Sequence, residues 1–377
     1  MKLVFFINSL STGGAERVIS KLADFYAAQG HDVTLLTLTG IDTDYYRVSA
    51  AVRRVSLNAG QLSTGPVSAL VNNLRRIAKA ARTFRRLRPD VVVAFMPTAS
   101  VLAVVAKLLA GRARTRVLVS ERVHAEFAGQ SRARNLLKRV TYPRAAHTIV
   151  LSPLTAQWLQ QHLNIKNCKV IPNGITLPLA EQKPIINPQD RFVDADKIIL
   201  LVGRISDQKQ PLLALDAFNA IAQSLPDWHL VYIGSGDLND ALTQGIATSK
   251  FTKRIHHMGR VGNMGDWYKR ADLFLSTAKY EGSPNALMEA MAHGCPVIAL
   301  DCPTGPGDLI RDLDNGLLLP IAPVQSQNTR LSQAIRTLAG DAPLRDQLGQ
   351  AAARIAHSHS DEQFFHRWSA VILGPQI

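Results

Sequence analysis

Cysteines, long hydrophobic runs and, in the first half of the chain, acidic residues are all scarce in this sequence of 377 residues. The three cysteines, Cys168, Cys295 and Cys302, form no C-x-x-C pair, and no His or Cys stands at the spacing of a structural zinc site. No run reaches the ~18 uncharged apolar residues that a membrane-spanning helix needs, and no secretory signal is evident. These absences predict a metal-free protein of the reducing cytosol that is not an integral membrane protein.

The shortage of acidic residues makes the first half strongly basic. Residues 1–175 hold 25 Lys and Arg against 8 Asp and Glu. The net charge of this half is therefore +17 (25 minus 8), which exceeds the +14 of the whole chain. Basic residues are densest in Asn73–Asp90, where apolar residues recur between them at helical spacing. This predicts an amphipathic helix with one positive face. A solvated surface, docking on anionic lipid and nucleic-acid binding all stay open. Lipid is favoured, because each well-placed cation contributes about 1 kcal/mol to such docking. Nucleic acid is the least favoured, because no nucleic-acid motif is present and aromatic residues are seldom interleaved.

Apolar residues are plentiful, at 46% against 19% charged, which is typical of a folded globular chain. The length exceeds that of one usual hydrophobic core, so two domains are expected. Short apolar strands alternate with amphipathic helices from Leu3–Ile7, and the same alternation restarts at Ile198–Val202. It predicts parallel sheets covered by helices on both faces. The expected fold class is α/β, with two facing Rossmann-like, doubly wound domains and ligand-binding loops at the carboxyl ends of their strands, in a cleft.

A stretch without periodicity sets the expected domain boundaries. Leu177–Asp196 is rich in proline and acidic residues, and it is expected to be the linker. The first domain would then cover residues 1–176 and the second residues 197–355. Residues 356–377 are expected to form a helix that returns to the first domain.

Two segments of the second half carry groups suited to a diphosphate. Arg204 and Lys209 follow the strand Ile198–Val202, where their side chains are expected to point into the cleft. Arginine binds phosphate oxygens through a fork, and lysine binds them as a point charge. A helix over Pro284–His293, capped by Ser283, is expected to present free N–H groups and the positive end of its dipole to the same ligand.

Two glutamates accompany that helix. Glu281 precedes it, and Glu289 lies within it among apolar neighbours, where a carboxylate needs a partner or a hydroxyl-rich ligand. The plainer alternatives are that Glu289 shares a solvated face with Asn285 and His293, and that Glu281 only offsets the helix dipole. In the first half, Gly13-Gly14 lets backbone approach a ligand closely, although G-x-G-x-x-G is absent.

Taken together, these residues resemble the family 4 glycosyltransferases, which have the two-domain GT-B architecture. The resemblance covers most of the chain and is strongest over Ile198–Pro320. Its signature is a pair of glutamates separated by seven residues, here Glu281 and Glu289. The supporting segments are Gly13-Gly14-Ala15-Glu16-Arg17, Ile171-Pro172-Asn173-Gly174, Gly203-Arg204 with Lys209, Gly234-Ser235-Gly236, Gly259-Arg260-Val261 and Gly294-Cys295-Pro296-Val297-Ile298-Ala299.

The resemblance implies a role for each matching residue in a retaining, metal-independent hexosyltransferase. Glu281, Lys209 and Arg204 would act at the reacting centre, where Glu281 would hydrogen-bond the transferred sugar and the two cations would stabilise the departing phosphate. Glu289 would accept the ribose hydroxyls, and the backbone at Arg260-Val261 would meet the base. The donor-binding residues implied in this way are Gly14, Arg204, Lys209, Arg260, Val261, Glu281, Asn285, Ala286, Leu287 and Glu289.

The same resemblance places three residues of the first domain near the acceptor or the sugar, namely Gly13, Arg122 and His124. Related enzymes often carry a His just after a strand end there. In this chain Arg122 stands at the matching position and His124 follows two residues later, so the choice between them stays open.

The predicted function is transfer of a hexose or N-acetylhexosamine from a UDP-sugar, with GDP as the alternative nucleotide, to a lipid-linked or polysaccharide acceptor. Asp301–Asp308 is similar to bacterial polysaccharide-assembly members, which favours that acceptor. No cofactor is expected beyond the nucleotide sugar as co-substrate, and no nucleic-acid partner. The expected location is the cytoplasm, in peripheral contact with the anionic inner face of the cytoplasmic membrane.

Two other functions are kept as alternatives: a nucleotide-sugar epimerase or hydrolase of GT-B architecture, and a non-catalytic protein that binds anionic lipid. A metal-dependent transferase would use a D-x-D pair. Three segments match that pattern, and they are interpreted as solvated acids in loops: Asp42-Thr43-Asp44, Asp194-Ala195-Asp196 and Asp312-Leu313-Asp314.

Overall fold

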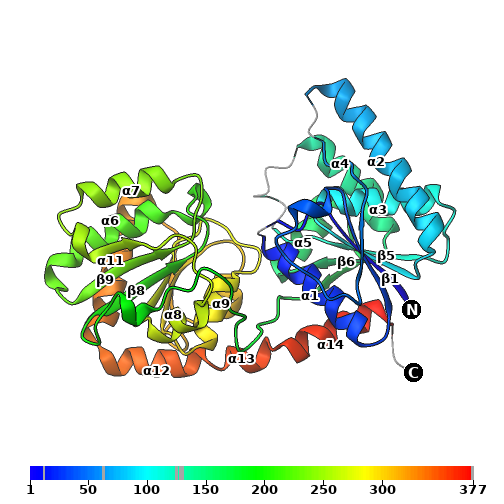
Figure 1. Cartoon of the computed structure of the whole chain (residues 1–377). Coiled ribbons are helices and arrows are strands. Elements are labelled where there is room, and N and C mark those ends of the chain that lie inside the picture. Colours follow the sequence, from blue (N-terminus) through cyan, green and yellow to red (C-terminus); the bar gives the residue numbers. More distant parts are fainter. Residues whose placement is uncertain (12, 62–63, 124–125, 127–130, 375–377) are drawn as a thin grey trace. The chain divides into compact units, whose positions relative to one another are not determined.

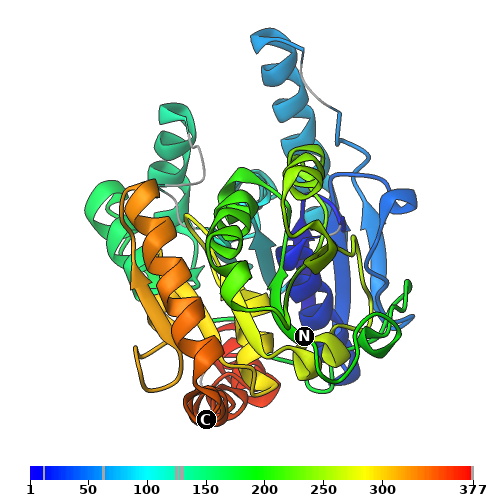
Figure 2. The same cartoon turned by 90° about the vertical axis from the view of Figure 1, so that its left-hand side faces the viewer.

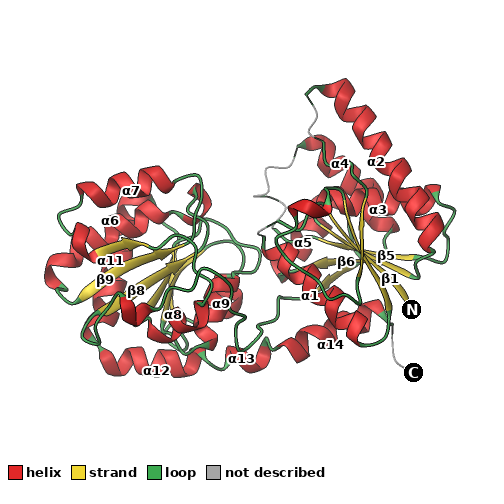
Figure 3. Cartoon of the chain, viewed as in Figure 1, coloured by secondary structure: helices red, strands yellow, loops and turns green. Residues whose placement is uncertain are grey.

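The computed structural model describes the whole chain except residues 12, 62–63, 124–125, 127–130 and 375–377. It divides into two compact units, residues 1–173 with 364–377 and residues 174–363. Each unit has its own parallel sheet, and helices cover both faces of each sheet (Figure 3). No helix in the described ranges combines the length and the apolar character that crossing a bilayer requires.

The first unit is a doubly wound domain. Within its described residues seven strands pair in the order β3-β2-β1-β4-β5-β6-β7, and each pairing is parallel. Its strands are β1 (Lys2–Ile7), β2 (Asp32–Thr37), β3 (Arg53–Ser56), β4 (Val91–Phe95), β5 (Arg116–Ser120), β6 (His147–Val150) and β7 (Cys168–Val170). Its helices are α1 (Gly14–Ala28), η1 (Ile41–Thr43), α2 (Pro66–Leu87), α3 (Pro97–Leu109), α4 (Arg132–Thr141), η2 (Tyr142–Arg144) and α5 (Pro153–Leu163).

Both faces of this sheet are buried, which explains why its strands are continuous apolar runs. Side chains alternate along a strand, so Val4 and Phe6 of β1 join the core under α2 and α3. Phe5 joins the opposite core, which α1 covers. The strand is therefore apolar throughout, as parallel strands between two helical layers usually are.

The last helix, α14 (Asp361–Ile372), completes the core on the α1 side of the first unit. Trp368 is fully buried and stacks on Phe95 with ring centroids 5.7 Å apart. The Tyr26 hydroxyl lies 3.1 Å from the Ser369 hydroxyl. Residues 356–377 were expected to return to the first domain, and residues 364–377 belong to that unit.

The second unit repeats the architecture. In the part of it that is described, six parallel strands are ordered β10-β9-β8-β11-β12-β13. Its strands are β8 (Lys197–Val202), β9 (Trp228–Ile233), β10 (Ile255–His257), β11 (Leu273–Ser276), β12 (Val297–Asp301) and β13 (Leu317–Pro320). Its helices are η3 (Pro188–Asp190), η4 (Asp207–Lys209), α6 (Pro211–Ile221), η5 (Ala222–Ser224), α7 (Asn239–Thr248), η6 (Thr252–Arg254), α8 (Met264–Arg270), α9 (Asn285–Ala292), α10 (Pro306–Leu309), α11 (Val324–Gly340), α12 (Ala342–Ala352) and α13 (Ile355–Ser358).

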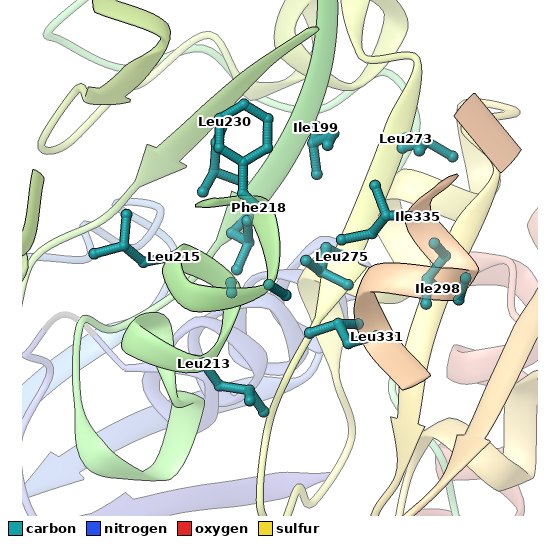
Figure 4. Close-up of a cluster of buried hydrophobic side chains, with 14 of the residues drawn as sticks. Ile199, Leu213, Leu215, Phe218, Leu230, Leu273, Leu275, Ile298, Leu331 and Ile335 are labelled. Carbon is teal, nitrogen blue, oxygen red and sulfur yellow. The ribbon is translucent and has the colours of Figure 1, made fainter. Parts of the chain in front are cut away.

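One face of the second sheet packs against α6 and α11. Figure 4 shows Ile199, Leu230 and Leu275 of the strands beside Phe218 of α6 and Ile335 of α11. Residues of β8 at the alternate positions, such as Leu200, join a second core with α8 and α9. The two-domain, doubly wound α/β architecture expected from the sequence is thus confirmed.

The segment 177–196, expected to be a linker, belongs to the second unit and is fixed to it. The Gln182 amide donates to the Gly262 carbonyl, and the Trp267 indole donates to the Ile186 carbonyl at 2.8 Å. Phe192 is buried in the core with α8 and α9. Its prolines and acids conceal this packing from a periodicity analysis, because the segment has no regular structure apart from the short helix η3.

Phe192 also closes over a pair of histidines on neighbouring strands. His229 Nδ1 lies 3.1 Å from His256 Nε2, and His229 Nε2 lies 3.4 Å from Asp196. Burial lowers the pKa of both rings from the ordinary value, and the proximity of His229 lowers that of His256 further. The Asp196 carboxylate raises the pKa of both rings, but the lowering by burial is the larger effect.

We expect this pair to make the second unit less stable in mild acid. Because the folded-state pKa values lie below the unfolded value of 6.5, the pair's contribution is complete above pH 6.5 and is lost as the pH falls through the folded-state values. Urea unfolding of wild type and of His229→Gln/His256→Gln at neutral and mildly acidic pH measures this. The double variant should lose less stability on acidification. A control, His162→Gln at an exposed site, should follow wild type, and equal pH slopes in all three proteins would refute the effect.

Candidate functional site

The candidate site lies at the carboxyl edge of the second unit's sheet. β8, β11 and β12 are neighbours there, so the segments that follow them emerge side by side. A pocket opens between these segments, and its wall combines apolar strand ends with charged loop residues. It is lined by Leu201, Val202, Gly203, Arg204, Ile205, Lys209, Pro211, Tyr232, Phe274, Leu275, Ser276, Thr277, Glu281, Pro284, Ala286 and Leu287.

Hydrogen bonds tie the loop after β8 to the loop after β11. The Thr277 hydroxyl donates to the Lys209 carbonyl at 2.7 Å. The Gln208 side-chain amide donates to the Tyr280 carbonyl at 2.8 Å, and the Lys279 amide donates back to Gln208. The two loops therefore form one fixed wall, in which the charged side chains are positioned by backbone that cannot move independently.

Lys209 and Glu281 form an ion pair across that wall. Glu281 is largely buried, with a side chain 7% exposed, whereas the Lys209 side chain is 27% exposed. The Thr304 hydroxyl, from the segment after β12, donates to the Glu281 carbonyl. Glu281 therefore does more than offset a helix dipole, which was the plainer alternative. The lysine keeps a solvent-facing side, and a ligand oxygen can bind its ammonium there.

Arg204 supplies a second cation to the pocket. Its side chain is exposed, and no carboxylate in the described ranges pairs with it. Arg204 and Lys209 thus line one pocket, as the sequence predicted for them, with the arginine unpaired and the lysine shared with Glu281. This arrangement suits an anion that needs two positive partners.

The helix α9 starts at the same pocket but differs in detail from the prediction. It begins at Asn285 rather than Pro284, and its N-cap residue, Pro284, has no side-chain cap. The expected cap by Ser283 is wrong, because this hydroxyl contacts the Met288 sulfur at 3.4 Å. The resemblance implies that the N–H groups of Asn285, Ala286 and Leu287 share the departing phosphate, but that of Asn285 donates to the Ser283 carbonyl.

The remaining two N–H groups, of Ala286 and Leu287, have no acceptor among the described residues. Both residues line the pocket with Arg204 and Lys209. First-turn amides of a helix carry the positive end of its dipole and bind anions readily. The helix start therefore adds two directed donors to the two cations.

Glu289 lies one helical turn further along α9 and is 8% exposed. The Tyr268 hydroxyl of α8 donates to its Oε2 at 3.0 Å. A solvated face shared with Asn285 and His293 is therefore wrong for Glu289. Its side chain is outside the pocket lining given above.

Arg260 and Val261 follow β10 at the same edge, two strands away from β8. Arg260 is exposed and Val261 is half-buried. Neither lines the pocket. Their loop is held from both sides, because the Gly234 amide donates to the Gly259 carbonyl and the Gly262 amide donates to the Pro184 carbonyl.

The residues predicted for the acceptor side belong to the first unit. Gly13 is the N-cap of α1 and Gly14 its first residue. Arg122 follows β5; it is 6% exposed, lies over the Phe95 ring at 4.8 Å and donates to Asn173 Oδ1. Burial lowers the Arg122 pKa to about 9. His124 lies outside the described residues.

The D-x-D acids have structural partners. Asp44 accepts two hydrogen bonds from Arg54, and Asp196 pairs with His229. Asp312 accepts the Leu318 amide at 2.9 Å. Asp44 is therefore not a solvated acid, because its side chain is 12% exposed and paired with Arg54, whereas Asp312 is exposed as expected. Within the described residues, no group of three or more His, Cys, Asp or Glu is arranged to hold a metal ion.

Several residues that shape the site were not predicted. Each of them acts through hydrogen bonds to a predicted residue or to its neighbour, and they are Tyr268, Thr277, Gln208 and Thr304. Such contacts join segments far apart in the chain, so no local spacing signals them. Asn173 is the exception, because it lies in the Ile171–Gly174 segment that the sequence already singled out.

Models of known protein families match both halves of the chain. The model described as "Glycosyltransferase Family 4" matches residues 12–178. The model described as "Glycosyl transferases group 1" matches residues 196–341. The first match covers most of the first unit, and the second match lies within the second unit.

Among curated proteins, the chain is 26% identical to the amylovoran biosynthesis glycosyltransferase AmsD of Erwinia amylovora over 373 residues, covering 98% of this chain and 99% of that protein. It is also 26% identical, over 91% of this chain and 92% of the relative, to the N-acetylgalactosamine-N,N'-diacetylbacillosaminyl-diphospho-undecaprenol 4-alpha-N-acetylgalactosaminyltransferase of Campylobacter jejuni. Among solved structures, Anabaena HepE in complex with UDP aligns over 100% of both chains with a TM-score of 0.78 at 18% identity. This likeness shows a shared fold, and the expected GT-B class is confirmed.

The close approach of two glycines holds the pocket wall in place. Gly203 directly follows β8 and Gly234 directly follows β9, and both have positive φ. A Cβ on Gly234 would lie 1.8 Å from the Gly203 carbonyl oxygen. Backbone cannot rotate away as a side chain can, so Arg204 depends on glycine at position 234.

Gly234→Ala should therefore destabilise the second unit by about 3 kcal/mol or more, as measured by urea unfolding. The matched control is Gly340→Ala, at a helical site where a Cβ meets nothing within 4 Å. It should leave stability unchanged or raise it by up to about 1 kcal/mol. If both variants unfolded like wild type, Gly234 would not be a steric requirement.

Proposed function

The chain belongs to the family 4 glycosyltransferases, and on that basis we propose that it moves a hexose or N-acetylhexosamine from a nucleotide-diphosphate sugar to an acceptor hydroxyl. The transfer retains the anomeric configuration and uses no metal. The observation that carries the proposal is the pocket that gathers Arg204, Lys209 and the free amides of Ala286 and Leu287. Two cations and two directed donors match the charge that a nucleoside diphosphate develops as it leaves.

In the proposed reaction the bond between the sugar's anomeric carbon and the distal phosphate oxygen breaks, and the acceptor oxygen bonds to the same carbon. The acceptor attacks from the side of the leaving group, so the configuration is retained, and the acceptor's proton passes to a phosphate oxygen. Arg204 and Lys209 stabilise the phosphate. Glu281, which already accepts a hydrogen bond from Lys209, is proposed to orient a sugar hydroxyl beside it.

The second unit is the proposed donor site, with UDP favoured over GDP. Glu289 is a buried carboxylate on the helix that supplies the amides, and it is proposed to accept the ribose hydroxyls, with Tyr268 orienting it. Backbone at Arg260-Val261 is proposed to meet the base. Solved structures of similar fold that are described as complexes with UDP, such as Anabaena HepE and TarM of S. aureus, support this nucleotide.

The first unit is the proposed acceptor site, at Gly13 and at either Arg122 or His124. A lipid-linked or polysaccharide acceptor is supported by two relatives, one that takes part in amylovoran biosynthesis and one whose name includes a diphospho-undecaprenol. Such an acceptor would be presented at a membrane. The basic character of residues 1–175 supports peripheral contact with the anionic inner face of the cytoplasmic membrane.

Lys209→Ala should lower kcat on the order of 100-fold or more, because a group that stabilises the leaving phosphate is removed. Lys197→Ala is the matched control: this lysine lies at the opposite end of β8 and pairs with Asp272 at 3.1 Å. The control should keep wild-type turnover. Equal turnover in Lys209→Ala and wild type, with both proteins folded, would count against the proposed site.

A panel of radiolabelled nucleotide sugars with membrane extract should give acceptor-dependent label from one UDP-sugar, and NMR of the product should show the donor's anomeric configuration. Chelator should leave the rate unchanged. An epimerase or hydrolase would instead alter the donor without acceptor, and a non-catalytic lipid-binding protein would leave every donor intact. Either result, or inversion at the anomeric carbon, would overturn the corresponding part of the proposal.

A further inference from the structure

The helix α4 of the first unit buries polar side chains and exposes apolar ones. Its buried positions hold Lys138 and Thr141, whereas Leu136, Leu137 and Val140 face solvent with exposures of 61%, 51% and 49%. A surface helix normally buries its apolar stripe and exposes its charges. This reversed arrangement leaves an apolar face that lacks a partner within the described residues.

A buried ion pair holds α4 in this orientation. Lys138 Nζ lies 2.8 Å from Glu121 Oε1, and the two side chains are 0% and 2% exposed. The Tyr142 hydroxyl donates to the same carboxylate. Separating a buried pair leaves an uncompensated charge, so α4 cannot turn its leucines inward without that cost.

The start of α2 presents a second unpartnered apolar face. Val67, Leu70, Val71 and Leu74 recur at helical spacing and are 57–77% exposed. The same stripe continues along the helix as Ala81 and Phe84, which are buried against the sheet. With 22 residues and about 1.5 Å per residue, α2 is too long for the sheet beneath it, so its first turns extend beyond the core.

The helices that carry the two apolar faces begin at the same edge of the first unit's sheet. α2 follows β3 and α4 follows β5, so both helices start at the carboxyl edge of the sheet. Both rise beyond the sheet in the same direction in the two perpendicular views (Figures 1 and 2). We call this set the apolar crest: Val67, Leu70, Val71, Leu74, Leu136, Leu137 and Val140.

Charge identifies the kind of surface that would cover the crest. Neither α2 nor α4 contains an acidic residue, and Arg75, Arg132, Arg134 and Arg139 are exposed beside the apolar positions. A second copy of the chain would bring the same positive charges together. An anionic lipid surface satisfies both features, since it accepts apolar side chains at the headgroup boundary and attracts arginine.

The positive face predicted for Asn73–Asp90 is exposed along α2, but part of it is engaged within the unit. Arg76 and Lys79 donate to backbone carbonyls of residues 57–61, and Arg85 donates to the Leu109 carbonyl. These three cations fasten α2 to neighbouring loops. Electrostatic docking through this stretch alone is therefore weaker than its composition suggests.

We propose that the apolar crest inserts into an anionic phospholipid bilayer, with the flanking arginines on the headgroups, and that the Glu121–Lys138 pair keeps α4 in the orientation that inserts. The proposal deepens the peripheral membrane contact of the proposed function and rests on it. It also links insertion to the acceptor side, since Glu121 precedes Arg122 at the end of β5.

The test compares Leu136→Gln/Leu137→Gln with Leu108→Gln/Leu109→Gln. Leu108 and Leu109 are as exposed, at 57% and 54%, but they end α3 at the opposite, amino edge of the sheet. Neither pair of changes alters net charge. Co-flotation of the full-length protein is measured with vesicles of phosphatidylglycerol and phosphatidylethanolamine, and with vesicles of phosphatidylcholine alone.

We expect wild type and the α3 variant to bind the anionic vesicles with equal affinity. The α4 variant should bind them with an affinity lower by about tenfold or more. Raising salt from ~50 to ~300 mM should weaken binding in all three proteins, while the ratio between wild type and the α4 variant persists. Unfolding temperatures show that each variant folds.

Equal binding by wild type and the α4 variant would overturn the proposal, as would an equal loss in the α3 variant. A shift from dimer to monomer in the α4 variant, with vesicle binding unchanged, would assign the crest to a second copy instead. Sugar transfer to a short-chain, water-soluble acceptor separates the two proposals. The α4 variant should retain it, whereas no transfer by wild type would refute the enzyme function and leave the vesicle result standing.

Discussion

The direction of the strands is the constraint on which the rest of the structure depends. Because every strand pairing in the described ranges is parallel, each strand ends at the same edge of its sheet and each return passes through a helix. The segments after β8, β11 and β12 are therefore neighbours, although more than seventy residues separate Lys209 from Glu281. Polar residues that would be costly inside the core are concentrated at this edge, where solvent and ligand can reach them.

The ion pair between Lys209 and Glu281 shows how such an edge can be both ordered and reactive. Glu281 is largely buried, so it needs a permanent partner, and Lys209 supplies one while its own side chain stays partly exposed. An ammonium group has three donors, and one bond to Glu281 leaves others for a phosphate oxygen. Arg204 has no such internal partner in the described part of the chain. The pocket therefore holds positive charge in advance of its ligand, and reorganisation costs little when an anion arrives.

Much of this could be predicted from the sequence, because parallel sheets buried on both faces leave short apolar runs that differ from amphipathic helices in period. The Ile198–Val202 run and the cations after it predicted β8 and one wall of the pocket. The detail at α9 was missed, since a Ser-Pro pair suits a helix cap, whereas the Ser283 hydroxyl contacts the Met288 sulfur within the same segment instead. Tyr268 was missed for a related reason: its bond to Glu289 joins two helices whose facing sides depend on how both pack against β11 and β12.

The helices α2 and α4 show what hydrophobic periodicity cannot predict. A period shows that a helix has an apolar face, but it does not show whether the core extends far enough to cover that face. On α2 the same stripe is buried at Phe84 and exposed at Leu70, so the end of the sheet, not the pattern, decides. On α4 the pattern suggests that the leucines face inward, and the buried Glu121 reverses this, because it requires Lys138 more than the core requires Leu136. A single carboxylate directly after β5 thus determines which face of a neighbouring helix the protein shows to its surroundings.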